Sequence, residues 1–175
     1  MTGGAETARP AAILTISSSK AAGAGEDESG PRLAALAERL GTVVAARAIV
    51  PDDRELIEAH LREWTDVERY ALVLTSGGTG LAPSDVTPEA TRAVIERDAP
   101  GIAEAMRDAS RAHTPFWMLS RALAGTRGTT LIVNFPGSPA AIDQTADALA
   151  EPLAHALDLL SGADGGHAAG GHAAG

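Results

Sequence analysis

Residues 70–92 constrain the fold of this chain more than any other stretch. An apolar run of strand length, residues 70–74, leads directly into the glycine-rich sequence TSGGTG at residues 75–80. Glycines at the end of a strand let backbone N–H groups approach a bulky polar ligand closely. A polar loop containing Asp85 follows, and Thr87-Pro88 opens a helix with a hydroxyl N-cap and a proline in the first turn. The stretch predicts a binding site for an anion, with Asp85 available for the metal ion that an anion often brings.

Two common phosphate-binding loops are excluded by this stretch. A P-loop requires a lysine directly after its last glycine, and the only lysine of the sequence is Lys20. The dinucleotide pattern G-x-G-x-x-G does not match residues 75–80 either. The sequence GGTG alone is compatible with a plain tight turn as well as with a ligand site, so the surrounding residues have to decide between the two.

Composition narrows the class of protein. The 175-residue chain predicts one domain, and its formal net charge of −9 argues against a nucleic-acid binder, because no basic patch can neutralise phosphates. The sequence contains no cysteine, which excludes disulfides and thiolate metal sites. No apolar run approaches the ~20 residues that span a membrane, and the first residues do not resemble a signal peptide. We therefore expect a cytoplasmic protein without a membrane anchor.

The order of apolar patterns predicts an α/β fold. Strands are expected at residues 11–16, 42–50, 70–75 and 129–135, and helices at 31–40, after 52, from 88, at 102–112 and at 138–161. The alternation of strands and helices predicts a three-layer α/β/α arrangement around a mainly parallel sheet. Residues 125–128 are interpreted as a turn, and Pro152 as a kink in the last helix. We expect the folded domain at residues 11–162, between a disordered lead-in at 1–10 and a disordered Gly/Ala/His tail at 163–175.

Several local patterns carry structural expectations. Asp52 and Glu55 have the spacing of a capping box, so Asp52 is expected to cap the helix that follows. Residues 21–31, rich in glycine and acids, are typical of a flexible surface loop. Phe116 and Trp117 are interpreted as a plug for the hydrophobic core, because aromatic side chains bury large areas.

Two helices are expected to start in the same way, each just after a strand. Thr87-Pro88 follows the strand at 70–75, and Ser138-Pro139 follows the strand at 129–135. Because the carboxyl ends of parallel strands meet at one edge of a sheet, both helix starts are predicted at the edge where such folds bind ligands.

Taken together, these stretches resemble the molybdopterin-binding fold of molybdenum-cofactor biosynthesis, which bacterial molybdopterin adenylyltransferases share with the G domains of gephyrin and with the competence-damage family. The similarity runs from about residue 13 to residue 161. Its motifs are VPDD at 50–53, TSGGTG at 75–80, DVTPEAT at 85–91, PGxxEAMR at 100–107, TPxxxLSR at 114–121 and NFPGSP at 134–139. The resemblance also gives the loop at 21–31 a functional alternative, because DESGP at 27–31 keeps the second half of a family pattern here. Ser18 and Ser19 depart from the charged pair of its first half.

The resemblance implies adenylyl transfer, in which the terminal phosphate of molybdopterin attacks the α-phosphate of ATP and pyrophosphate leaves. Asp52 and Asp85 would be the catalytic carboxylates and would hold Mg²⁺ on the triphosphate. The amides of residues 77–80 and the helix start at Ser138 would hold phosphate oxygens. The residues implied in binding the pterin or the nucleotide are Thr75, Ser76, Gly77, Gly78, Thr79, Gly80, Ser120, Arg121, Asn134, Pro136, Gly137 and Ser138.

The resemblance also implies partners. The family forms homotrimers, and Leu81 and Trp64 are apolar residues that we expect one small domain to leave uncovered. Adenylated molybdopterin would pass to a molybdate insertase. Two alternatives stay open, a non-catalytic molybdopterin-binding carrier or scaffold of the same fold and a competence-damage-type nucleotide pyrophosphatase. Asp52 and Asp85 together favour the enzyme over the carrier, and the competence-damage family usually carries a second domain.

Overall fold

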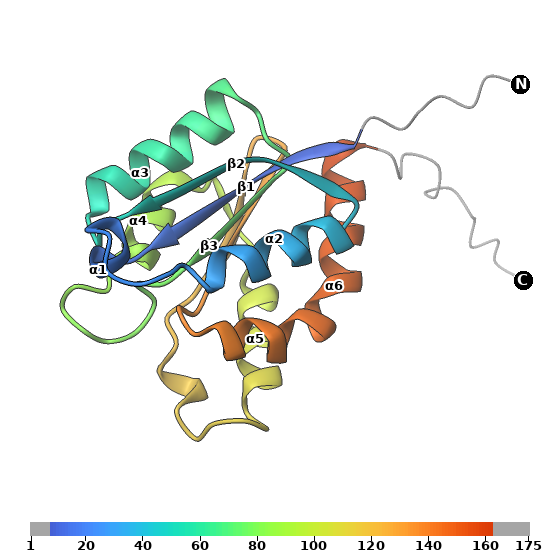
Figure 1. Cartoon of the computed structure of the whole chain (residues 1–175). Helices are drawn as coiled ribbons and strands as arrows, with labels where there is room; N and C mark the ends of the chain where they lie inside the picture. Colours follow the sequence, from blue (N-terminus) through green and yellow to red (C-terminus); the bar gives the residue numbers. More distant parts are fainter. Residues whose placement is uncertain (1–7, 163–175) are drawn as a thin grey trace, which may run out of the picture.

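A six-stranded sheet forms the centre of the molecule, and helices cover both of its faces (Figure 1). The computed structural model describes residues 8–162. The strands are β1 (Arg9–Ile16), β2 (Thr42–Val50), β3 (Leu72–Ser76), β4 (Arg97–Asp98), β5 (Ala124–Arg127) and β6 (Thr130–Phe135). The helices are α1 (Ser18–Ala21), α2 (Ser29–Arg39), α3 (Arg54–Arg62), α4 (Thr87–Val94), α5 (Pro100–Ser110) and α6 (Pro139–Ser161), with a π-helical turn η1 (Glu63–Val67) and a 3-10 turn η2 (Trp117–Leu119).

The sheet is mainly parallel, as predicted. Its strand order is β2-β1-β3-β6-β5-β4, and the first four strands in this order run in parallel. Their carboxyl ends share one edge of the sheet, where α1 and the loop after β3 also lie (Figure 1). The predicted three-layer α/β/α fold is confirmed, and the site predicted from the sequence falls at this edge.

The interpretation of residues 125–128 as a turn is wrong. Residues 124–127 form β5, which pairs antiparallel with β6 on one side and with the two-residue strand β4 on the other. The turn between β5 and β6 consists of residues 128–129, so the predicted turn is right only at Gly128, whose φ is 55°. The sequence of β5, AGTR, has too little apolar alternation to indicate a strand, so only its pairing in the sheet reveals it.

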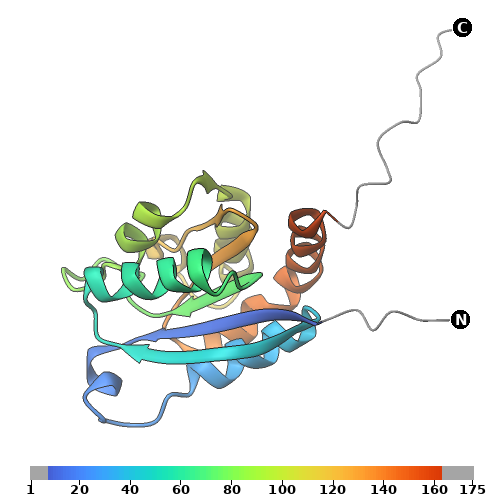
Figure 2. The same ribbon diagram turned by 90° about the horizontal axis from the view of Figure 1, so that it is seen from above.

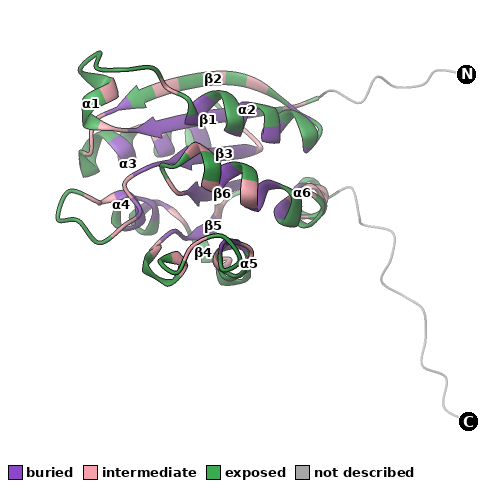
Figure 3. Cartoon of the chain, turned by 60° about the horizontal axis from the view of Figure 1, so that its bottom comes forward, coloured by how far each residue is buried: buried purple, intermediate pink, exposed green. Residues whose placement is uncertain are grey.

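Each buried strand contributes to two hydrophobic cores, because successive side chains of a strand point to opposite faces of the sheet. Ile13 of β1 packs into the core beneath α2, α5 and α6, and the next residue, Leu14, packs into the core beneath α3 and α4. Figure 2 shows α2 and α3 on opposite sides of β1 and β2. Figure 3 shows the buried strands enclosed between helices whose outer surfaces are exposed. The apolar run at residues 11–16 is thus a doubly covered strand, as its continuous hydrophobicity indicates.

The expectation that Trp64 stays uncovered is wrong. Its side chain is only 6% exposed and belongs to the core beneath α3 and α4, where its ring lies 6.4 Å from that of Tyr70. Leu81, the other residue named, is 64% exposed. The difference follows from their elements, because Trp64 extends the helical stripe of α3 through η1, whereas Leu81 lies in the loop after β3.

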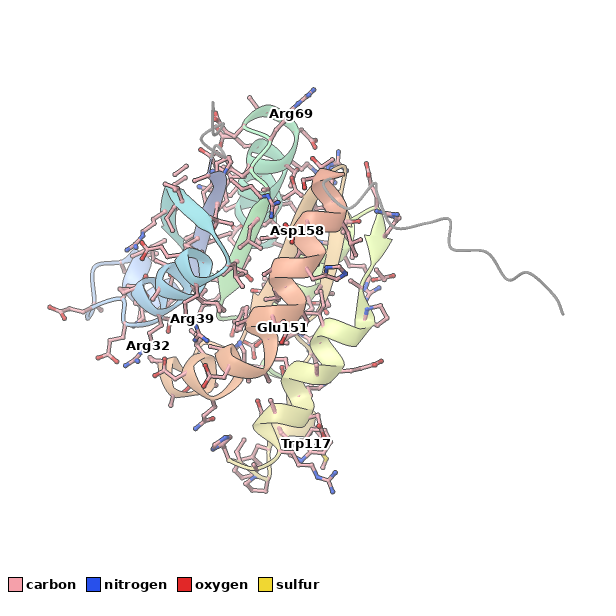
Figure 4. The ribbon with its side chains drawn as sticks, turned by 90° about the vertical axis from the view of Figure 1, so that its right-hand side faces the viewer. Arg32, Arg39, Arg69, Trp117, Glu151 and Asp158 are labelled. Carbon is pink, nitrogen blue, oxygen red and sulfur yellow. The ribbon has the colours of Figure 1, made fainter. Side chains whose placement is uncertain are left out.

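The long helix α6 covers one face of the sheet and forms ion pairs with α2. Arg32 and Arg39 of α2 form ion pairs with Asp143 and Asp147 of α6, and Figure 4 shows both arginines on α2 beside this helix. Pro152 lies inside α6 as predicted, and the helix changes direction along its length (Figure 1). Among the described residues, no helix combines the length and the apolar character that crossing a bilayer requires.

The domain begins two residues earlier than predicted. Strand β1 starts at Arg9, and the Arg9 guanidinium donates to Asp158 of α6 at 2.6 Å. The remainder of the predicted lead-in, residues 1–7, and the predicted tail at 163–175 lie outside the described residues.

Candidate active site

A polar hollow of about 220 Å³ opens where β1, β2, β3 and β6 end. We call it the strand-end hollow. Its lining consists of Thr15, Ile16, Ser17, Lys20, Ser29, Asp52, Ser76, Gly77, Gly78 and Gly137. Because the four strands are parallel, their ends bring together residues that are more than 100 positions apart in the sequence.

The loop after β3 can be formed only with glycine at two positions. Gly77 and Gly78 have φ values of 102° and 63°, in the left-handed region that other residues avoid. A Cβ at Gly77 would lie 2.1 Å from the carbonyl oxygen of Ile16, and one at Gly78 would lie 2.4 Å from the hydroxyl of Thr87. The loop backbone therefore packs directly against the end of β1 and the start of α4.

The expectation that the amide of Gly77 is free for a ligand is wrong, because its N–H donates to the carbonyl of Phe135 at 3.1 Å. This bond continues the pairing of β3 with β6 past the end of the strands. The next three amides, those of Gly78, Thr79 and Gly80, have no acceptor among the described residues. The loop thus offers three consecutive N–H groups to an anion instead of four.

Two side chains hold this loop from behind. The expected helix cap at Thr87 is wrong, since α4 includes Thr87 and the Thr87 hydroxyl donates instead to the carbonyl of Gly77 at 2.8 Å. Arg121 donates to the carbonyls of Gly80 at 2.7 Å and of Asp85 at 2.6 Å, and it pairs with Glu89. The hydrogen bond from Arg121 holds the pKa of the Glu89 carboxyl below its usual range. The structure therefore shows Arg121 bracing the loop, while the predicted contact of Arg121 with the pterin stays a prediction.

The expected helix cap at Asp52 is also wrong, and the structure gives this carboxylate a different role. The cap of α3 is Asp53, whose side chain accepts from the N–H of Leu56 at 3.0 Å. Asp52 turns back to Ser18, and its Oδ2 accepts from the Ser18 N–H at 3.0 Å and from the Ser18 hydroxyl at 2.7 Å. The same hydroxyl accepts from the Asp52 N–H at 3.0 Å. Asp52 is thus fixed at the rim of the strand-end hollow, with Oδ1 beside Gly78.

Asp85 lies apart from Asp52. Its Oδ2 accepts from the N–H of Ala82 at 2.9 Å and lies against Gly80, so the carboxylate closes the loop on itself. It is not among the residues that line the strand-end hollow. The two aspartates that the sequence places in one role therefore stand at different positions around the glycine loop.

The end of β6 supplies the other wall. The prediction that Ser138 caps a helix is confirmed, since its side chain accepts from the N–H of Ala141. Gly137 lines the hollow, and its carbonyl accepts from the hydroxyl of Ser29 at 2.9 Å. Asn134 is fully buried below the loop and donates to the hydroxyls of Thr75 and Thr91, both at 3.0 Å. Thr75 and Asn134 thus support the site from beneath.

A smaller, mostly apolar hollow of about 140 Å³ lies on the other side of Pro136. We call it the apolar hollow, and Ser120 lines it together with Phe116 and Trp117. The interpretation of the two aromatic residues as a core plug is wrong for Phe116, whose side chain is 69% exposed. Phe116 and Trp117 form a wall of a surface hollow. Their segment, residues 112–119, follows α5 and precedes β5, and it adds no strand to the sheet.

Sequence reasoning missed the contributions of the end of β1, of α1 and of the start of α2, which supply Thr15, Ser17, Lys20 and Ser29. The interpretation of residues 21–31 as a flexible loop fails at its end, where Asp27 accepts from the N–H groups of Ser29 and Gly30 and from the hydroxyl of Thr15. Asp27 thereby acts as a cap at the start of α2. The sequence DESGP at residues 27–31 indicates such a cap, because Asp27 stands two residues before Ser29, at the start of a helical pattern.

These features define an α/β protein with a polar hollow at the carboxyl edge of its sheet, where several hydroxyls, one carboxylate and the free amide of Gly78 meet beside the rest of the glycine loop. Residues 12–156 match the family described as a probable molybdopterin binding domain, and the chain belongs to this family.

Known relatives agree with this assignment. The molybdopterin adenylyltransferase of Helicobacter pylori strain J99 is 37% identical over 152 residues, which cover 86% of each protein. The Drosophila melanogaster molybdenum cofactor synthesis protein cinnamon is 40% identical over 149 residues, but these cover 85% of this chain and 25% of that relative. The chain thus spans about a quarter of the larger protein. The crystal structure of the molybdopterin biosynthesis enzyme MoaB from Thermus thermophilus has a TM-score of 0.82 at 43% identity, with 88% of this chain and 97% of that chain covered.

Proposed function

We propose that this chain is a molybdopterin adenylyltransferase of molybdenum-cofactor biosynthesis. In the reaction, an oxygen of the terminal phosphate of molybdopterin forms a bond with the α-phosphorus of ATP. The bond from that phosphorus to the oxygen bridging the α- and β-phosphates breaks, and pyrophosphate leaves with the electron pair. The products are adenylated molybdopterin and pyrophosphate.

The observation that carries the proposal is the strand-end hollow, in which Asp52 lies beside Gly78, the first of three consecutive residues with free amides. Phosphoryl-type transfer depends on positioning and on charge neutralisation more than on a protein nucleophile. The N–H groups of Gly78, Thr79 and Gly80 would hold phosphate oxygens, and the attacking phosphate is already anionic, so no general base is required. The name of the Helicobacter pylori relative, of which this chain covers 86%, supports the same reaction.

Magnesium is the cofactor that the reaction implies, and Asp52 fits it. Oδ2 of Asp52 accepts both hydrogen bonds from Ser18, and Oδ1 beside Gly78 has no donor among residues 8–162. Mg²⁺ usually binds one or two carboxylates together with substrate phosphates, which suits such a site better than a protein cage. Within the described part of the chain, no group of three or more His, Asp or Glu side chains could hold a metal ion. We propose that Asp52 holds Mg²⁺ and that Asp85 contributes across the loop, where the ion would neutralise charge on the triphosphate.

The two hollows differ in polarity, and each suits a different part of the substrates. The strand-end hollow suits phosphates, and the apolar hollow, which Ser120, Phe116 and Trp117 line, suits a flat ring. Pro136 lines the apolar hollow and Gly137 lines the polar one, so adjacent residues separate them. We propose that Ser120 contacts the pterin here.

The remaining proposals concern assembly and location. We propose a cytoplasmic homotrimer that passes adenylated molybdopterin to a molybdate insertase. Leu81, Phe116, Met118 and Leu119 are exposed apolar side chains that contacts between copies could cover. Three chains of 17.7 kDa give a mass of about 53 kDa. Light scattering at micromolar concentration tests the assembly, and a monomer would contradict it.

The activity test uses the purified protein with molybdopterin and Mg-ATP. We expect adenylated molybdopterin and pyrophosphate in equal amounts, measured by chromatography and by a coupled pyrophosphate assay. Molybdopterin binding without any product would indicate a carrier. Pyrophosphate released from ATP in the absence of molybdopterin would indicate a nucleotide pyrophosphatase. Either result would overturn the proposal.

A further inference from the structure

Lys20 is the only lysine in the sequence, and it lines the strand-end hollow. It lies in α1, directly after β1, and its side chain is half-buried. The motifs of the glycine loop and of β6 do not include it, because the end of β1 reaches the hollow only through the fold. No role for this residue follows from the reaction described above.

The charge of Lys20 is not matched by an anion. The only polar contact of its Nζ among residues 8–162 is with the carbonyl of Glu26, at 2.8 Å, and a carbonyl carries no net charge. Lys20 forms no ion pair within the described chain, which it shares with six of the thirteen arginines, but none of those six lines the strand-end hollow. An ammonium group has three N–H donors, so two remain for another partner.

The residues that line the hollow indicate what the charge of Lys20 can bind. Among the described residues, Lys20 is the only cation that lines the strand-end hollow, and Asp52 is the only carboxylate. The rest of the lining is uncharged and includes the backbone of Gly78 and Gly137. The carbonyl of Glu26 holds the ammonium in place before a ligand arrives, which lowers the entropy lost on binding.

We propose that Lys20 binds a phosphate group of the substrates, with its ammonium facing the anion that the loop amides also hold. The inference rests on the proposed function for the identity of its ligand. The phosphate belongs either to the triphosphate of ATP or to molybdopterin, and both present the same chemistry to an ammonium. A lysine acts here as a compact point charge, as it does in other phosphate sites.

Acylation of the amine tests the proposal in the unmodified protein. The protein reacts with an N-hydroxysuccinimide acetate, and mass spectrometry of peptides measures the rate at Lys20, which no second lysine can obscure. Ligands are added at ten times their Kd, determined by calorimetry, so about one tenth of the sites stay free. We expect Mg-ATP, pyrophosphate or molybdopterin to slow acylation by up to about tenfold, and the compound that does so identifies the phosphate. Adenosine, which lacks phosphate, should leave the rate unchanged.

Substitution gives an independent measurement of binding. We expect Lys20→Met to weaken the binding of the protecting compound ~10- to 100-fold, the scale of one hydrogen bond to a charged group. Lys20→Arg should restore most of the affinity. Arg47→Met is the matched control, because it removes one exposed positive charge from β2, outside the hollow, and should leave the affinity unchanged.

The outcomes separate the two proposals. If the protein binds a phosphate compound but neither protects Lys20 nor loses affinity on Lys20→Met, the assignment of Lys20 is wrong and the proposed function stands. If no phosphate compound binds the unmodified protein, the proposed function and the assignment of Lys20 are both wrong.

Discussion

Two charged hollows lie at opposite edges of the sheet, and we propose only one of them as the substrate site. The strand-end hollow measures about 220 Å³, whereas a hollow at the amino ends of β3 and β6 measures about 360 Å³. We call the second one the far-edge hollow; it is lined by Thr65, Asp66, Arg69, Glu96, Arg127, Gly128 and Thr129. Figure 4 shows Arg69, from this hollow, and Trp117, from the apolar hollow, at opposite ends of the molecule.

Three charged groups of the far-edge hollow already have partners within the fold, whereas the exposed Arg69 has none among the described residues. Arg127 donates to both carboxylate oxygens of Asp66, at 2.6 and 2.8 Å, and the N–H of Gly128 donates to Glu96. In the strand-end hollow, by contrast, Lys20 forms no ion pair within the described chain and Gly78 begins a run of unmatched amides. The two hollows therefore differ in their unmatched backbone amides and in Asp52, and not in their volume or in having an unpaired cation, and we base the proposed anion site on this difference.

The largest expected effect comes from Asp52, the carboxylate of the strand-end hollow. We expect Asp52→Asn to lower the rate of adenylation by roughly 10²-fold or more, the scale of one electrostatic group at a charged transition state. The melting temperature should change little, because an amide oxygen can still accept from Ser18. Asp53→Ala is the matched control and should cost about 1 kcal/mol of stability as a lost helix cap, with the rate unchanged. An inactive Asp53→Ala beside an active Asp52→Asn would reverse the assignment of these two neighbours.

Asp85 tests whether the two aspartates act on one ion although the structure separates them. We expect Asp85→Asn to keep molybdopterin binding, because the loop amides do not depend on the carboxylate, and to lower turnover by roughly 10²-fold. The double variant with Asp52→Asn should lose much less than the product of the single losses, since groups that act as a unit are not additive. Steady-state rates of the four proteins measure this. Losses that simply multiply would show that Asp85 acts independently of Asp52.

Substitution of one glycine at each edge of the sheet compares the two edges directly. A Cβ at Gly78 meets the Thr87 hydroxyl at 2.4 Å, whereas a Cβ at Gly128 meets nothing within 4 Å, and both residues have positive φ. We expect Gly78→Ala to cost ~1–3 kcal/mol and to abolish nucleotide binding, and Gly128→Ala to cost about 1 kcal/mol with normal binding. Thermal unfolding and calorimetric titration with Mg-ATP measure the two effects. Equal loss of binding in both variants would remove the distinction between the edges.

The smallest effect concerns the ion pair of the far-edge hollow. The hydrogen bond from Arg127 lowers the pKa of the Asp66 carboxyl below its ordinary value of 3.8. A lowered pKa contributes stability that is complete above the unfolded value and is lost as the pH falls through the folded value. We therefore expect Asp66→Asn to cost at most about 1 kcal/mol at pH 7, because the Asp66 side chain is 43% exposed, and the difference to shrink below about pH 4. Urea unfolding at pH 7, 5 and 3 measures this, and a difference that grows on acidification would contradict it.

The sequence predicts the layers of the fold well, because they depend on apolar patterns. Residues 11–16 and 42–50 are strands as expected, since continuous or alternating hydrophobicity is a local signal. Strand β5 escapes prediction because its sequence has no such pattern and pairing with β6 alone makes it a strand. The exposure of Phe116 escapes for a related reason, since the path of a loop decides whether an aromatic ring reaches the core.

The candidate site is predicted in its position but not in its hydrogen bonds. Asp52, Gly78 and Gly137 meet in one hollow because parallel strands end together, a rule that the order of elements already contains. Asp53 caps α3 in place of Asp52, because the Asp52 carboxylate accepts hydrogen bonds from Ser18 instead. Ser18 lies 34 residues before Asp52, so the local sequence around α3 does not reveal this contact. Lys20 is conspicuous in the sequence only as a lone lysine, and its place in the site depends on the turn after β1.

The most direct test of the comparison is a titration of ¹⁵N-labelled protein with Mg-pyrophosphate, followed by two-dimensional NMR of the backbone amides. The glycine loop at the strand-end hollow has the unmatched N–H groups of Gly78, Thr79 and Gly80, and the far-edge hollow has the N–H of Gly128, which is already bonded to Glu96. Our account predicts saturable shifts at Gly78, Thr79 and Gly80, with Gly128 unmoved. Shifts at Gly128 without shifts at Gly78 would contradict it.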